Sequence, residues 1–207
     1  MNRRKAIGRI ALTGIGGGLL LAGYKWYDWT RTPDITYVEQ HKELITALAE
    51  TIIPTTKTPG APGTDTPGAP ETDTPGAKEA GVGDYIVVMI RDCTDRMSAN
   101  KFIDGLKQLG HYCQNHFDKP YQQCSEADQQ AVLHYFEEKD APYKGIVGKA
   151  QEAFLGRSFF ATLKKYTVEG YCSSELGATK GLSYLYIPGS FHGCIPLQPG
   201  QKAWATR

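Results

Sequence analysis

Histidine and cysteine gather in one stretch of the 207-residue chain, at His111, Cys113, His116 and Cys124. Imidazole and thiolate are ligands that zinc prefers in proteins, so this stretch is a candidate metal site. On a helix, however, positions 113 and 116 share a face while position 111 points elsewhere. The C-x2-C pair typical of structural zinc sites is also missing. A buried cysteine with solvated histidines is the favoured interpretation, and a stand-alone metalloprotein is the alternative.

No other residue pattern indicates an active site. The sequence lacks G-x-S-x-G, H-E-x-x-H, the P-loop and the C-x-x-C-H haem motif. The neighbouring acids Glu137 and Glu138 fall on a polar helix face, where solvent accounts for them. His192 lies in a Gly-bounded loop without a catalytic partner. We therefore expect no catalytic, cofactor-binding or metal-binding residue in this chain.

The first thirty residues have the layout of an export signal. Arg3 and Arg4 precede an apolar run over 10–22 that four glycines make less hydrophobic than an ordinary secretory signal. This pattern resembles the twin-arginine signal, which exports folded proteins to the periplasm. The alternatives are an ordinary secretory signal and a membrane anchor over 7–24. An uncleaved signal would leave the protein associated with the inner membrane.

Five cysteines follow this signal, at positions 93, 113, 124, 172 and 194. Disulfides are expected in an exported protein. Several pairings are open, and Cys93 and Cys124 flank the predicted helix that contains Cys113. We predict a disulfide between Cys93 and Cys124, at the two ends of that helix.

The elements that position these residues are predicted to be helices. Apolar residues recur every three or four positions, the period of an amphipathic helix. The apolar run over 81–93 fits a helix or a buried strand, and its helical neighbours favour a helix. Ser98 and Ser125 are predicted N-caps. The predicted helices span 36–53, 81–93, 98–117, 125–140 and 144–171. The expected fold is an all-α compact bundle.

Two segments interrupt this helical pattern. Residues 58–77 repeat an octet, TPGAPGTD, TPGAPETD and a third TPGA. Proline and glycine exclude a helix there, and the lack of large apolar side chains from 55 to 77 predicts a loop outside the core. We expect that deleting 58–73 leaves stability and partner binding nearly intact. Residues 170–207, rich in glycine, proline and aromatic residues, are predicted to form an extended arm. The chain then divides into a signal over 1–30 and one helical domain over 31–207.

Charge excludes one class of function. The formal net charge is +1, and four of the 23 Lys and Arg residues lie in the first nine positions, which leaves a slightly acidic body. Such a body lacks the basic surface that nucleic acid requires.

Several stretches together resemble the small subunit of gluconate 2-dehydrogenase, the subunit 3 family. They are ETIIPTT, TPGAKEAGVGDYI and, most specifically, SELGATKGL with PGSFHGCIP near the C-terminus. The resemblance extends over roughly 37–205, and the first two octets of the repeat depart from it. It implies a non-catalytic partner of a large FAD-containing dehydrogenase of the glucose-methanol-choline type, which oxidises a sugar, sugar acid or polyol. It further implies a cytochrome c subunit in some complexes.

The resemblance also implies an escort role. The small subunit binds the folded flavoprotein in the cytoplasm and lends it the twin-arginine signal, which the translocase recognises. The arm offers large aromatic residues of the kind enriched at interface hot spots. The partner-binding candidates are Tyr171, Tyr184, Tyr186, Phe191 and Trp204. The alternative is an arm that wraps its own bundle. A metalloprotein and a membrane-anchored structural protein remain the rival functions.

Overall fold

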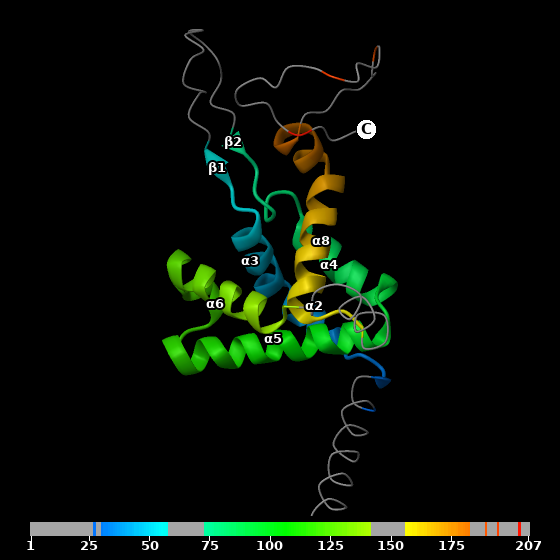
Figure 1. Cartoon of the computed structure of the whole chain (residues 1–207), viewed down its shortest axis with the longest axis vertical. Helices are drawn as coiled ribbons and strands as arrows, with labels where there is room; N and C mark the ends of the chain where they lie inside the picture. The colour runs from blue at the N-terminus through cyan, green and yellow to red at the C-terminus, as the bar shows by residue number, and fades with distance from the viewer. Residues whose placement is uncertain are drawn as a thin grey trace, which may run out of the picture.

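The computed structural model describes residues 27, 30–57, 73–141 and 156–182, and the single residues 189, 194 and 203. The labelled elements are shown in Figure 1. They are α2 (Ile35–Gln40), α3 (Lys42–Ile52), β1 (Thr56–Lys57), β2 (Asp73–Thr74), α4 (Val82–Val88), α5 (Arg96–Phe117), α6 (Glu126–Lys139) and α8 (Phe159–Ser173). Two π-helical turns, Met89–Cys93 and Gly177–Gly181, extend α4 and follow α8, and a 3-10 turn, Tyr121–Gln123, precedes α6.

The predicted all-α class is confirmed. Within the described ranges, β structure is limited to β1 and β2, whose two-residue antiparallel ladder pairs Thr56 with Thr74 and Lys57 with Asp73. The run over 81–93 is helical, as its neighbours suggested. The helix predicted over 36–53 is divided at His41, whose ring stacks on Tyr37 with centroids 3.9 Å apart.

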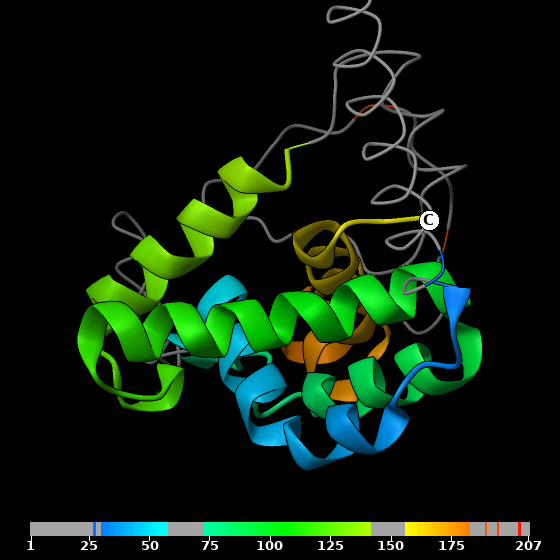
Figure 2. The ribbon, with the colours of Figure 1, turned by 90° about the horizontal axis from the view of Figure 1, so that it is seen from below.

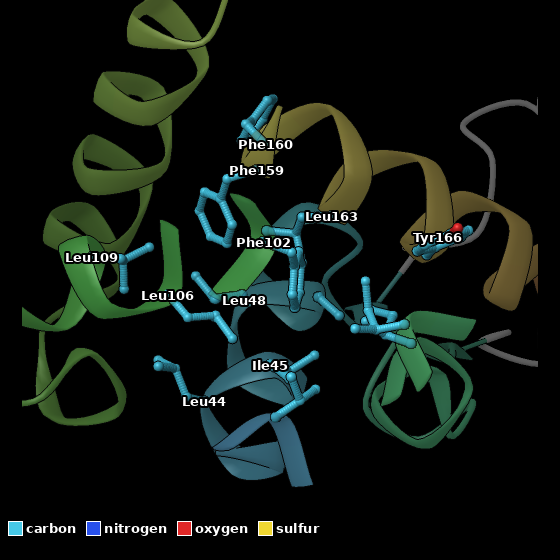
Figure 3. Packing of buried hydrophobic residues seen from close by; sticks show 14 of the residues in the cluster. Leu44, Ile45, Leu48, Phe102, Leu106, Leu109, Phe159, Phe160, Leu163 and Tyr166 are labelled. Carbon is cyan, nitrogen blue, oxygen red and sulfur yellow. The ribbon is translucent and has the colours of Figure 1, made fainter. Parts of the chain in front are cut away.

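The core is built around α8. This helix packs against α3, α4, α5 and α6, while α5 crosses the bundle as a long bar (Figure 2). Figure 3 shows side chains from α3, α5 and α8 converging on one apolar centre. Among those that exclude solvent completely are Ile45, Leu48, Phe102, Leu106 and Leu163. Their burial is the main stabilising contribution to the bundle.

One glycine lets α8 approach α5. A Cβ built at Gly105 would overlap the ring of Phe159. That ring also packs on Phe102 and Phe136, at centroid distances of 5.5 and 5.8 Å. The missing side chain of Gly105 therefore creates the space in which the start of α8 is seated.

The helix ends correct several sequence expectations. Asp95, rather than Ser98, caps α5, because its carboxylate accepts a hydrogen bond from the Ser98 amide at 2.9 Å. Ser125 caps α6 as predicted, accepting from the Asp128 amide at 3.2 Å. The described part of the helix predicted over 144–171 begins only at Phe159, after the positive φ of Gly156, and 142–155 lie outside the described residues.

The arm begins later than predicted. Residues 170–173 belong to α8, and a π-helical turn follows at Gly177–Gly181. Ser174 starts that turn by accepting a hydrogen bond from the Gly177 amide at 2.9 Å. Serine is a preferred N-cap residue, and here it lies within a Gly-rich stretch. The prediction of an extended arm from position 170 is therefore wrong up to position 181, where the chain is helical.

Two glycines of α5 offer a matched test of this packing. Gly105→Ala places a methyl group against Phe159 and should lower the free energy of unfolding by about 1–3 kcal/mol. Gly110→Ala, where a Cβ meets nothing within 4 Å, should raise it by up to about 1 kcal/mol through helix propensity. Urea unfolding of both variants measures the difference. Equal effects at the two positions would contradict the close contact.

Candidate functional site

The carboxylate of Glu50, in the last turn of α3, joins the two sides of the repeat tract. Its Oε1 accepts hydrogen bonds from the Thr55 amide at 2.9 Å and the Thr55 hydroxyl at 3.0 Å. Its Oε2 accepts a hydrogen bond from the Lys78 amide at 2.7 Å. Hydrogen bonds to an ionised carboxylate are stronger than neutral ones. A single side chain thus holds the chain where it enters and where it leaves the tract.

The third copy of the repeat is part of the core. Pro75, Gly76 and Ala77 are buried, and the Ala77 amide donates to the Ile53 carbonyl at 2.9 Å. A Cβ at Gly76 would overlap the Glu50 carboxylate and lie 2.6 Å from the Thr55 nitrogen, so this close approach requires glycine. The expectation that the whole of 55–77 lies outside the core is therefore wrong for its last residues. Residues 58–72, which make up the first two copies except for Asp73 of β2, lie outside the described residues.

Tyr171 connects this segment to the start of the arm. Its side chain is 6% exposed, and its hydroxyl donates to the Pro75 carbonyl at 2.7 Å. Burial raises the pKa of this phenol above its ordinary value, which keeps it a donor. A Cβ at Gly181 would overlap the same phenol. Tyr171 is consequently a core residue, and its predicted partner-binding role stays a prediction.

Glu50, Thr55, Pro75, Gly76 and Tyr171 form what we call the tract–arm junction. β1, β2 and the C-terminal end of α8 lie at the same end of the molecule (Figure 1). Most hydrogen bonds of the junction hold backbone groups, and the Thr55 hydroxyl that donates to Glu50 also accepts a hydrogen bond from the Gly76 amide at 3.1 Å. The contacts of the junction therefore fix the position of the chain. Sequence reasoning missed Glu50 and Gly76, although both fall in the stretches ETIIPTT and TPGAKEAGVGDYI that carry the family resemblance.

The other predicted partner-binding residues are Tyr184, Tyr186, Phe191 and Trp204, and all four lie outside the described residues. The same holds for Arg3 and Arg4 of the predicted signal. Over the ranges that the structure describes, no helix has the length and hydropathy needed to cross a membrane.

The histidines and cysteines of the candidate metal site are not brought together. His111 and His116 are exposed, and His116 stacks on Tyr112 with ring centroids 3.9 Å apart. Cys113 is fully buried. Across the described part of the chain, no group of three or more His, Cys, Asp or Glu side chains is placed to hold a metal ion.

The predicted disulfide between Cys93 and Cys124 is not formed, because the structure has both as free thiols at opposite ends of α5. Cys93 precedes the N-cap Asp95, whereas Cys124 lies beyond the C-terminal end of α5, after the turn Tyr121–Gln123. From Arg96 to Cys113 the helix rises roughly 25 Å. A disulfide requires Cα atoms within about 7 Å. Residues that flank a long helix in sequence are thus kept apart by it.

The junction yields a test with a control inside the repeat. Gly76→Ala should lower the free energy of unfolding by about 2 kcal/mol, because the added methyl group displaces the Glu50 carboxylate. Gly68→Ala changes the equivalent glycine of the second copy, and we expect less than about 0.5 kcal/mol there. Thermal or urea unfolding compares them. A loss of similar size in both variants would contradict the special role of the third copy.

Comparison with known protein families shows which family this chain resembles. The family model described as Gluconate 2-dehydrogenase subunit 3 matches residues 69–189, more than half of the chain. The match begins just before the third TPGA copy and includes α4, α5, α6, α8 and the start of the arm. Searches of curated proteins and of solved structures found no match. The extent of the family match decides the assignment: this chain belongs to the gluconate 2-dehydrogenase subunit 3 family.

Proposed function

We propose that the chain is a non-catalytic small subunit of a periplasmic FAD-dependent dehydrogenase that oxidises a sugar, sugar acid or polyol. The family match over 69–189 carries this proposal. The FAD belongs to a large subunit of the glucose-methanol-choline type, and a cytochrome c subunit can take the electrons onward. The small subunit binds the folded large subunit and exports it by means of Arg3 and Arg4.

The tract–arm junction supports a binding role for the arm. Tyr171 holds Pro75 on one side and faces Gly181 on the other, so the arm leaves the bundle from a fixed point. A binding segment whose origin is already fixed loses less conformational freedom on association. The aromatic residues beyond that point are of the types that dominate interface energies. They are Tyr184, Tyr186, Phe191 and Trp204.

Recovery of the complex from the native host tests this function. The full chain with a C-terminal affinity tag should bring down a flavoprotein whose absorbance spectrum is that of FAD and which oxidises a sugar or polyol with an artificial electron acceptor. A quadruple variant with alanine at the four aromatic arm positions should recover at least tenfold less flavin, the loss expected when hot-spot residues are truncated. Recovery of the tagged chain alone, or equal flavin in both samples, would contradict the proposal.

Shortening the repeat tests whether the tract, in addition to the arm, contributes to binding of the large subunit. Because Asp73 is part of β2, the deletion should remove one whole octet, 58–65, and leave the ladder and the third copy in place. We expect unfolding free energy within about 0.5 kcal/mol of the original, since loop closure depends only weakly on length. Flavin recovery should be unchanged. A clear loss of flavin at unchanged stability would show that the tract itself contacts the large subunit.

Export gives an independent readout. Replacing Arg3 and Arg4 together with lysine should leave both subunits in the cytoplasm as an intact, FAD-loaded complex, because the twin-arginine pair is the expected translocation signal. Arg9→Lys is the matched control, a same-charge change in the same segment outside the pair. Fractionation with dehydrogenase assays of each fraction makes the measurement. Periplasmic activity that survives the double substitution would contradict the escort role.

A further inference from the structure

A stack of aromatic rings joins α5 to α6. The ring of Tyr112 has its centroid 3.9 Å from that of His116 and 4.7 Å from that of Tyr135, with interplanar angles of 18° and 20°. Rings stacked this closely on one ring must cover its opposite faces, so Tyr112 is the middle of the stack. Phe136 packs edge-on against Tyr112 and Tyr135, at centroid distances of 6.0 and 5.4 Å.

These rings line a shallow groove, which we call the α5–α6 groove. Its volume is about 280 Å³, and the rest of its lining consists of Gln108, His111, Asn115 and Lys139. Tyr135 is 42% exposed, so ring surface is open to solvent. Sites that enclose a whole small ligand usually have volumes of about 300–1,000 Å³. The α5–α6 groove is smaller and open, and it is better suited to a few side chains of a peptide.

The charge of the groove favours an acidic occupant. Lys139 Nζ donates to Gln108 Oε1 at 2.8 Å and lies 5.2 Å from the ring centroid of Phe136. None of the described residues that line the groove is Asp or Glu. Glu137, close by on α6, pairs with Lys164 of α8 at 3.0 Å. The ammonium group of Lys139 is therefore the charge that an occupant of the groove meets.

The first two copies of the repeat have the chemistry that this groove requires. Each contains PGAP, at 59–62 and at 67–70, which is the P-x-x-P spacing. Such segments favour the polyproline II conformation and bind grooves lined by aromatic rings. Residues 58–73 also carry three acids, Asp65, Glu71 and Asp73, and no Lys or Arg. The third copy, part of the core, has Lys78 where the others have their second proline.

We propose that the P-x-x-P motifs in the repeat tract of one copy of this chain bind the α5–α6 groove of a second copy. The prolines pack on the exposed ring surface of Tyr135 and its neighbours, and the acids of the tract approach Lys139. This contact links copies of the chain to one another. It is independent of the proposed function, because it involves neither the flavoprotein nor the arm.

The tract is held away from the groove of its own chain. The ladder pairs Lys57 with Asp73, so both ends of 58–72 are fixed at one place. Pro59 follows Lys57 by two residues, and Pro70 precedes Asp73 by three. Figure 1 shows α5 crossing the bundle at the end away from β1 and β2. A second copy carries no such restraint, which makes it the occupant we infer.

A fluorescent synthetic peptide of residues 58–73 tests the docking on the purified full chain. We expect the anisotropy of the peptide to rise and saturate as the chain is added. A second peptide, with alanine at positions 59, 62, 67 and 70, should bind at least tenfold more weakly, since it lacks the prolines that favour the bound conformation. Both peptides have the same charge, so the comparison separates recognition of proline from electrostatic attraction.

Variants of the groove locate the binding site. Tyr135→Ala should weaken peptide binding at least tenfold, and Lys139→Glu should weaken it as well, because the acids then meet a like charge. Val168→Ala is the control: it removes a side chain of α8 that is 45% exposed and lies outside the groove, so affinity should not change. Urea unfolding verifies that each variant is folded.

Sedimentation velocity over a range of concentrations tests the contact between whole chains. The full chain should associate reversibly, and excess peptide should reverse the association. A full chain with alanine at the four tract prolines should associate at least tenfold more weakly, and its identical N-terminal segment makes it a matched control. Absence of peptide binding, or equal binding by the Tyr135→Ala variant, would overturn the proposal. Peptide binding tenfold tighter to the proline-substituted chain would also overturn it, since the tract would then occupy its own groove.

Discussion

The seating of α8 among α3, α4, α5 and α6 is the constraint on which the rest of the structure depends. Two glycine contacts fix it. Near its start, Phe159 occupies the space over Gly105 of α5, and near its end Gly170 leaves room for Tyr85 of α4. Because successive helix residues are rotated by about 100°, facing Gly170 toward Tyr85 also fixes the direction of Tyr171. The hydrogen bond from Tyr171 to Pro75 follows from that rotation.

Because of the same constraint, the repeat tract and the arm leave the bundle at neighbouring points of the tract–arm junction. Glu50 holds Thr55 and Lys78, and Gly76 fits only because it has no side chain. Chain can therefore be inserted before the third copy without disturbing the bundle, since closing a longer loop adds little free energy. This explains how the bundle can accommodate the repeat copies that precede the third one. It also distinguishes the buried residues 75–77 from the copies that precede them.

Periodicity predicted much of this fold, since Phe102, Leu106, Leu109 and Cys113 form one stripe in the sequence and are all buried on α5. Local sequence signals did not predict the helix ends correctly where tertiary contacts determine them. Asp95 and Ser98 are both capping residues, and only the path of the chain selects Asp95. The glycines after position 170 favoured the prediction of an extended chain, so the helical turn that follows Ser174 was not predicted.

The candidate site was harder to predict than the helices, because it depends on residues far apart in sequence. Glu50 and Lys78 are 28 positions apart, and Tyr171 and Pro75 are 96 apart. No local sequence pattern predicts these long-range contacts. The disulfide prediction is wrong for the same reason, because Cys93 and Cys124 flank one helix in the sequence and that long helix keeps them apart. The turn that follows α5 begins with Asp118 in a left-handed conformation, which is rare for a residue other than glycine.

Hydrogen exchange of the chain, alone and in complex with the proposed flavoprotein partner, tests the central claim most directly. We propose that the helical bundle presents the arm beyond residue 182 to a large subunit. Amides of 183–207 should gain protection of tenfold or more on binding, while those of α8 and of 74–77, already slow to exchange in the free chain, should change little. Unchanged exchange in 183–207, with new protection confined to the outer faces of α5 and α6, would contradict it.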